Sequence, residues 1–167
     1  MSVDMQKVIV LPRLEGVKTC VFTQHLVTFH ETFAPLGNKS KDIRKRPVIS
    51  PVSHEALSGR NAEDLASAYV KVFCSDHLRD VDSTVFYVDN CSAQNKNWTL
   101  FTVLVSTVNA ATGPQTVTLR YLEKSHTFML ADSYHASAES AMRKMKSVCD
   151  FVILYLQWNA MVLRSLK

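Results

Sequence analysis

Acidic residues stand beside the expected elements of an α/β fold, at positions where such folds bind their ligands. Asp89 follows the apolar run 84–88, Glu63 lies at the start of an expected helix, Glu55 precedes that helix, and Asp132 opens the last one. Phosphodiester chemistry on nucleic acids commonly uses two divalent ions about 4 Å apart, held by carboxylates from separate elements. Each acid also has a structural interpretation, because Asp forms Asx turns after strands and caps helices.

The positions of these acids depend on the elements around them. Asn61 and Asp64 form a capping pattern, and apolar residues at helical spacing then predict a helix over residues 61–75. The segment 17–33 is rich in Val, Thr and Phe, which favours one or two strands. Glu31 falls in phase with the apolar residues there. Because an unpaired carboxylate is costly on an apolar face, we interpret the strand as ending before it.

The second half of the chain predicts alternating strands and helices. The run 84–88 is typical of a central strand covered on both faces, and the alternating residues 116–123 predict another strand. Between them, apolar residues at spacings of 3, 4 and 3 from Trp98 predict a helix, while the many β-branched residues leave a strand open. Asp132 is expected to cap a final helix, and residues 148–163 are expected to form more helix.

The composition fits one folded α/β domain. Of 167 residues, 47% are hydrophobic, and there are only 4 Gly and 5 Pro, which excludes a disordered tail and a low-complexity repeat. A net charge of +4 permits a polyanionic partner without the dense basicity of a histone-like protein. We therefore expect a mixed sheet with helices packed against it.

Cysteine spacing and hydropathy favour an intracellular chain, either nuclear or cytoplasmic. The four cysteines, separated by 54, 17 and 58 residues, match neither a zinc site nor a disulfide framework, and we interpret them as reduced thiols. The first 11 residues lack a cleavage-site pattern, so no signal peptide is expected. The apolar run 151–163 has only 13 residues, too few to span a bilayer, and no membrane partner is expected.

Two groups of residues are candidates for contact with DNA. Lys96 and Asn95 offer a cation and an amide to a phosphate backbone, next to Trp98, which we assign to the core. The loop 35–51 carries a basic cluster that either contacts phosphates, acts as a nuclear import signal or is simply solvated. The cluster includes Arg44, Lys45 and Arg46. Binding through these groups would be weak, independent of sequence and sensitive to salt. A homo-oligomer stays open beside a monomer.

Three motifs together resemble a known family. The string Tyr87-Val-Asp-Asn-Cys-Ser-Ala-Gln-Asn-Lys-Asn-Trp-Thr99 is similar to the pattern D-N-C-x-x-Q-N-K-N of an uncharacterised transposon-derived domain with a ribonuclease H-like fold of the DDE-transposase type. Residues 125–132 are similar to its G-H-T-x-x-x-x-D, and residues 55–63 to its W-x-E-x-x-x-G-R-x-x-E. The resemblance covers roughly residues 5–150, and the stretch around Asp89 is its most specific part.

The resemblance implies a fold and a site. The fold would be a ribonuclease H-like mixed sheet flanked by helices over residues 17–150, with an N-terminal extension, 1–16, and a C-terminal helical extension, 151–167. The activity would be cleavage or strand transfer of DNA that depends on Mg²⁺ or Mn²⁺. The implied metal ligands are Asp89, Asp132 and the helix acid Glu63, with Glu55 as a further catalytic candidate.

The sequence also departs from the family pattern. Such enzymes take a carboxylate from their first strand, and in the segment assigned to that strand only Glu31, beside His30, is near the right place. Ser53 replaces the family's Trp, and Ser125 replaces its Gly. His126 either contacts a phosphate or metal-bound water or has a structural role. Three functions therefore stay open. The first is a transposase-derived enzyme, intact or degenerate, and the second a non-enzymatic nucleic-acid or protein-binding module on the same scaffold. The third is a ribonuclease that acts on RNA–DNA hybrids.

Overall fold

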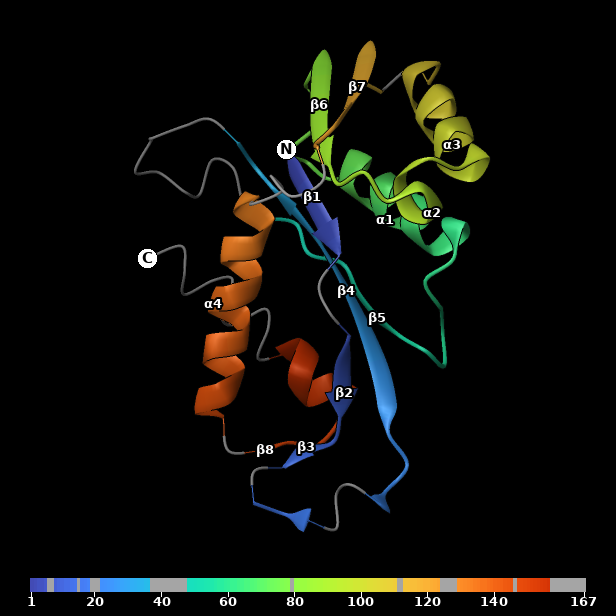
Figure 1. Cartoon of the computed structure of the whole chain (residues 1–167). Coiled ribbons are helices and arrows are strands. Elements are labelled where there is room, and N and C mark those ends of the chain that lie inside the picture. Colours follow the sequence, from blue (N-terminus) through green and yellow to red (C-terminus); the bar gives the residue numbers. More distant parts are fainter. Residues whose placement is uncertain are drawn as a thin grey trace.

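The computed structural model has a mixed β-sheet with helices on both faces (Figure 1). It describes residues 1–5, 8–14, 16–18, 22–36, 48–78, 80–110, 113–123, 129–145 and 147–156. The strands are β1 (Ser2–Met5), β2 (Ile9–Leu11), β3 (Arg13–Leu14), β4 (Leu26–Ala34), β5 (Val52–His54), β6 (Ser83–Val88), β7 (Thr116–Tyr121) and β8 (Ser147–Val148). The helices are α1 (Ala62–Phe73), α2 (Ser92–Asn95), α3 (Trp98–Val108) and α4 (Leu130–Lys144). The expectation of an α/β fold with a mixed sheet is confirmed at this level.

The strand order in the sheet is β2-β4-β1-β6-β7, with β5 paired to β4. β1 runs antiparallel to β4 and parallel to β6, and β6 runs parallel to β7. β3 and β8 form a separate antiparallel pair. The parallel strands β1, β6 and β7 therefore end at one edge of the sheet, where α/β folds bind ligands.

The N-terminal segment is part of the sheet. The predicted domain boundary at residue 17 would separate β1 from β4 and β6, to which it is hydrogen-bonded. Val3, on one face of β1, is 3% exposed and packs in the main core. With only four residues, β1 is too short for alternation in the sequence to reveal its place in the sheet.

β4 continues past the position where we expected it to end. The strand reaches Ala34, and Glu31 is a buried residue within it, paired with Met5 of β1. The prediction that the strand ends before Glu31 is therefore wrong. Burial first, and then the charge of Asp4, raise the pKa of the Glu31 carboxyl well above its usual range, so the group avoids part of the cost of a buried charge by holding a proton.

Helices α1 and α3 cover one face of the sheet. The predicted helix and its capping box, Asn61 with Asp64, are confirmed in α1. Phe33, Tyr69 and Phe86 meet edge to face between α1 and the sheet, with ring centroids 5.0 to 6.2 Å apart.

The segment 98–108 is also helical, as α3, but Trp98 is 84% exposed, so its assignment to the core is wrong. Apolar spacing predicted the helix correctly. It does not identify which apolar residues lie on the buried face.

Helix α4 covers the other face, beside a second core cluster. Met142 of α4 packs there with Leu11, Val148 and Leu154. Instead of continuous helix from residue 148, the chain forms β8 and then a short helical segment over 151–156, while the rest of the expected extension lies outside the described residues.

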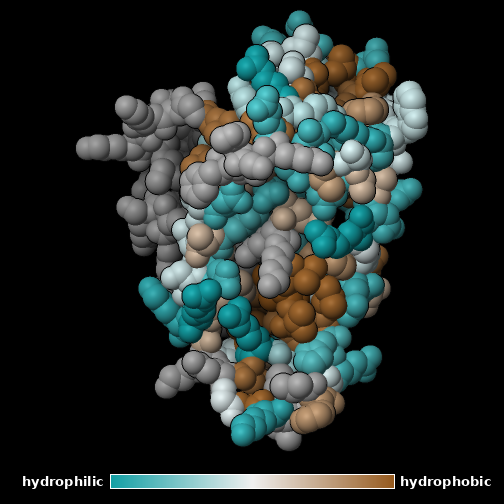
Figure 2. All heavy atoms as spheres, in the orientation of Figure 1, coloured by the Kyte–Doolittle hydropathy of each residue, from teal (hydrophilic) through white to brown (hydrophobic). Residues whose placement is uncertain are grey.

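Figure 2 shows a hydrophobic area over β2 and the adjoining part of β4, where Val10 is 42% exposed. Of the helices described, none is long and apolar enough to cross a bilayer.

Candidate metal centre

Two carboxylates meet at the edge where the parallel strands end, and the charge of a third acts on one of them. Asp4 comes from β1, and Asp89 follows the last residue of β6. β1 and β6 are paired with Val3 opposite Val88, so Asp4 and Asp89 each come directly after a paired residue. Asp132 enters from the first turn of α4. Asp4 is the carboxylate of the sheet's first strand, a role for which sequence reasoning had found only Glu31.

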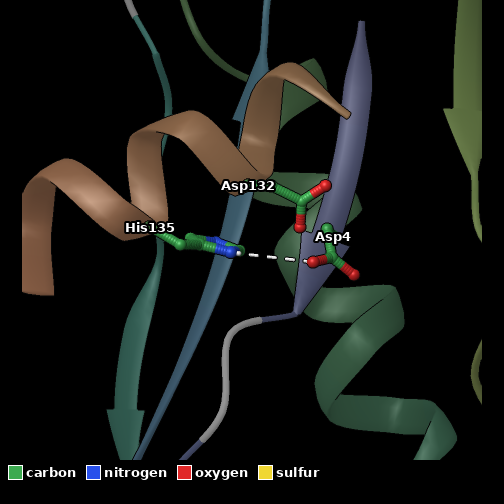
Figure 3. Close-up of side chains that lie close together, drawn as sticks. All are labelled: Asp4, Asp132 and His135. Atoms are coloured by element: carbon green, nitrogen blue, oxygen red, sulfur yellow. Dashed lines mark ion pairs between the residues drawn. The ribbon is translucent and has the colours of Figure 1, made fainter. Parts of the chain in front are cut away.

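Asp4, Asp132 and His135 form a compact group of ligand atoms. One atom from each of the three side chains lies within 4.8 Å of the others. Asp132 and His135 are three residues apart on α4, so both project from the same side of the helix. Figure 3 shows both side chains directed toward Asp4 on β1, with His135 Nδ1 3.6 Å from Asp4 Oδ2. These residues offer two carboxylates and an imidazole to one point in space.

The electrostatics of the site favour a bound cation. Burial first, and then the charges of Asp132 and Asp89, raise the pKa of Asp4 from 3.8 to about 7. A divalent cation would relieve this repulsion, because its attraction favours the ionised carboxylates. Burial lowers the pKa of His135, while Asp132 opposes that shift. His135 is therefore mostly neutral at pH 7, and its 3.6 Å approach to Asp4 is a long polar contact more than an ion pair.

Backbone caps hold Asp89 and Asp132 in place. Asp132 is the third residue of α4, and its Oδ2 accepts a hydrogen bond from the Met129 backbone N–H at 2.6 Å. The N-cap residue is thus Met129, and the expectation that Asp132 itself occupies that position is wrong. Asp89 Oδ1 accepts from the Cys91 backbone N–H at 3.3 Å and from Asn95 Nδ2 at 2.5 Å. Capping and turn formation here fix the directions of the carboxylates, so the structural role is compatible with metal binding.

A buried polar network lies behind His135. His135 Nε2 is 2.9 Å from Thr32 Oγ1, and that oxygen is 3.2 Å from His30 Nε2. His30 also contacts the Ser50 hydroxyl. Burial, followed by the proximity of His135, lowers the pKa of His30 well below its usual value. The network fixes the ring of His135 in the way that outer partners orient the ligands of metal sites.

Two acids predicted from the sequence lie outside this group. Glu63 is exposed on α1, on the face of the sheet opposite to α4. Glu55 is also exposed, and its Oε1 accepts a hydrogen bond from the Val27 backbone N–H at 2.9 Å. Val27 lies at the start of β4, whereas Thr32, which contacts His135, lies near its end. Glu55 thus joins the segment after β5 to β4 through a hydrogen bond. Other predicted residues lie outside the described residues: His126, Arg44, Lys45 and Arg46.

Sequence reasoning missed Asp4 and His135. Asp4 lacked a signal because a four-residue strand has no measurable periodicity. His135 had a signal, since it stands three residues after Asp132 and a helix brings such residues to one side.

The predicted DNA-contacting residues adjoin Asp89. Asn95 is 6% exposed, and its side-chain amide donates to Asp89 and so orients it. The backbone carbonyl of Asn95 accepts a hydrogen bond from the Tyr121 hydroxyl at 2.8 Å. Lys96 is exposed, contacts the Asn90 side chain, and lies 4.7 Å from the centre of the Tyr121 ring. A cation is thus available beside the acidic edge, while Asn95 serves to position Asp89.

Comparison of the chain with protein-family models, curated proteins and solved structures finds no match. The chemistry of the site therefore rests on its geometry. Three carboxylates from separate elements, a neutral imidazole and a nearby lysine form an arrangement suited to a hard divalent cation and a phosphate-bearing ligand.

Proposed function

We propose that the chain is a transposase-derived, ribonuclease H-like domain that cleaves or transfers DNA strands with Mg²⁺ or Mn²⁺ held by Asp4, Asp89 and Asp132. The observation that carries the proposal is that ligand atoms of Asp4 and Asp132 lie within 4.8 Å of one another. Asp89 is close enough for its charge to raise the pKa of Asp4. Asp4 also supplies the first-strand acid that the resemblance requires, in place of Glu31.

The donor set fits the proposed metal. Carboxylate oxygens are the ligands that Mg²⁺ and Mn²⁺ prefer, whereas Zn²⁺ sites usually contain more nitrogen and sulfur. Asp89 keeps Oδ2 free of donors among the residues described, since both of its hydrogen bonds use Oδ1. A bound ion would polarise a phosphate oxygen and lower the pKa of a water molecule for attack. The protein's own part is to fix the three carboxylates and to hold His135 against Thr32.

The surface next to Asp89 supports nucleic acid as the substrate. Lys96 supplies an exposed cation for a phosphate, and Trp98, at the start of α3, offers an exposed ring on which an unpaired base can stack. Neither residue reads a base edge, so binding would be independent of sequence and weakened by salt. Arg44, Lys45 and Arg46 would add phosphate contacts.

Nicking of supercoiled plasmid in Mn²⁺ tests the proposal. We expect the wild-type chain to nick the plasmid, and Asp4→Asn and Asp89→Asn to lose activity by about a hundredfold or more, since the amide keeps the shape but removes the charge that holds the ion. Glu63→Gln is the matched control, because it removes an acid outside the site and should retain activity. Equal nicking by all four proteins would refute the carboxylate mechanism. No nicking by any of them would favour the non-enzymatic binding module.

A further inference from the structure

A pocket lies on the face of the sheet opposite to the candidate metal centre. It has a volume of about 350 Å³ and lies between β4, β5 and α1. Met5, Phe29 and Leu57 are among the apolar residues that line it, and Leu57 is 78% exposed. Its size is that of a small-molecule site, and both apolar and polar residues line it.

Glu31 is the polar group within this pocket. The residue is 94% buried, since only 6% of its surface is exposed, yet it lines the pocket. Within the described part of the chain, no side chain or backbone group forms a hydrogen bond or ion pair with its carboxyl. Native proteins satisfy nearly all of their buried polar groups, so a buried carboxyl that faces a cavity without a partner indicates a partner outside the chain.

The other polar groups around the pocket form no hydrogen bond or ion pair with the Glu31 carboxyl among the described residues. Asp64 lines the wall, but its Oδ2 accepts from the backbone N–H groups of Gly59 and Asn61 at 2.8 and 3.3 Å. Ser58 also lines the pocket, and its buried hydroxyl has no hydrogen-bond partner among the residues that the structure describes. Lys71 is exposed to solvent, which screens its charge. Glu31 therefore supplies the lining carboxyl that has no hydrogen-bond partner among the described residues.

We propose that this pocket binds a small organic cation, whose ammonium, amidinium or guanidinium group pairs with Glu31 and whose apolar body packs against Met5, Phe29 and Leu57. When the cation binds, Glu31 releases to solvent the proton that burial makes it hold, and the cation donates to the resulting carboxylate. The site is separate from the metal centre, which lies across the sheet under α4, and it does not depend on the proposed nuclease activity.

Benzamidine is a suitable probe, because it joins an amidinium to a flat apolar ring, and benzamide is its neutral counterpart of nearly the same shape. The ¹⁵N-labelled full chain would be titrated with each compound and followed by NMR. We expect benzamidine to shift the backbone amides of Ser58 and Gly59, and benzamide to bind about tenfold more weakly, since a hydrogen bond to a charged group contributes roughly 1.5–3 kcal/mol.

Two variants test the site itself. Glu31→Gln removes the charge and should weaken benzamidine binding about tenfold or more. Ser67→Phe, at an exposed position that lines the pocket, places a ring at the mouth and should block binding without disturbing the core. Asp89→Asn is the control for the metal centre and should bind benzamidine as the wild type does. The proposal is overturned if the Ser58 and Gly59 amides do not shift, if benzamide binds equally well, or if Glu31→Gln and Ser67→Phe leave the affinity unchanged.

Discussion

Replacement of Asp4 by Asn should make the chain more stable at pH 8 and less able to bind metal. The pKa of Asp4 is raised from 3.8 to about 7, mainly by burial and then by the charges of Asp132 and Asp89. The folded chain therefore holds a proton on Asp4 between about pH 4 and pH 7 that the unfolded chain has lost. Stability falls as the pH rises through this window, and below it both states are protonated and the penalty disappears.

The size of the effect follows from the shift. A shift of about three units corresponds to an upper bound of about 4 kcal/mol at 1.36 kcal/mol per unit. The Asp4 side chain is 23% exposed, so solvent screening reduces this value. We expect Asp4→Asn to exceed the wild type in free energy of unfolding by about 1–2 kcal/mol at pH 8, and by much less at pH 4.5.

Urea unfolding at the two pH values measures the difference, with Glu63→Gln as a control for the loss of an acid outside the site. Urea unfolding in the presence of Mg²⁺ is a second measurement. At a concentration one hundredfold above its Kd, the ion would stabilise the wild type by about 2.7 kcal/mol, and it should stabilise Asp4→Asn far less. The reasoning would be refuted if Asp4→Asn were no more stable than the wild type at pH 8, or if its advantage were the same at both pH values.

Four further substitutions test the fold and the site, the first three by urea unfolding and the last by Mn²⁺ binding. Gly113→Ala should cost more than about 1 kcal/mol, because the added Cβ would lie 2.0 Å from the Thr107 backbone oxygen. Trp98→Ala should change stability by less than about 0.5 kcal/mol, whereas Phe86→Ala should cost about 3–5 kcal/mol; similar costs would contradict the assignment of Trp98 to the surface. Asn95→Ala should lower Mn²⁺ affinity about tenfold or more, because Asp89 loses the side-chain donor that orients it, and an unchanged affinity would remove Asn95 from the site.

Local patterns in the sequence were sufficient for the elements that carry their own signal. The capping box at Asn61 and the helical spacing that follows define α1, and the apolar run before Asp89 defines β6. These signals lie within one element, so no knowledge of its neighbours is needed. Asp132 was found for the same reason, since it stands in the first turn of a helix.

Features that depend on distant contacts were not predictable in this way. Asp4 belongs to the centre of the sheet because β1 pairs with β4 and β6, far away in sequence. Glu31 lies inside β4 because β4 pairs with β1 at this position, where Glu31 is opposite Met5. From the sequence alone, its acidic side chain had indicated that the strand ends before it. Glu63 was assigned to the site from its place at a helix start, yet α1 lies on the other face of the sheet. In each case the decisive fact is which segments pack together, and that is a property of the whole chain.

The central claim is that Asp4, Asp89 and Asp132 form one site for a divalent cation, and Mn²⁺ binding measured by electron paramagnetic resonance tests it most directly. Free Mn²⁺ would be followed during titration of the wild type, of Asp4→Asn, Asp89→Asn and Asp132→Asn, and of Glu63→Gln as the control. The account predicts that the wild type and Glu63→Gln bind Mn²⁺ with the same affinity and that each of the three Asp→Asn variants binds about tenfold more weakly or worse. Equal Mn²⁺ binding by all five proteins, or a loss confined to Glu63→Gln, would contradict it.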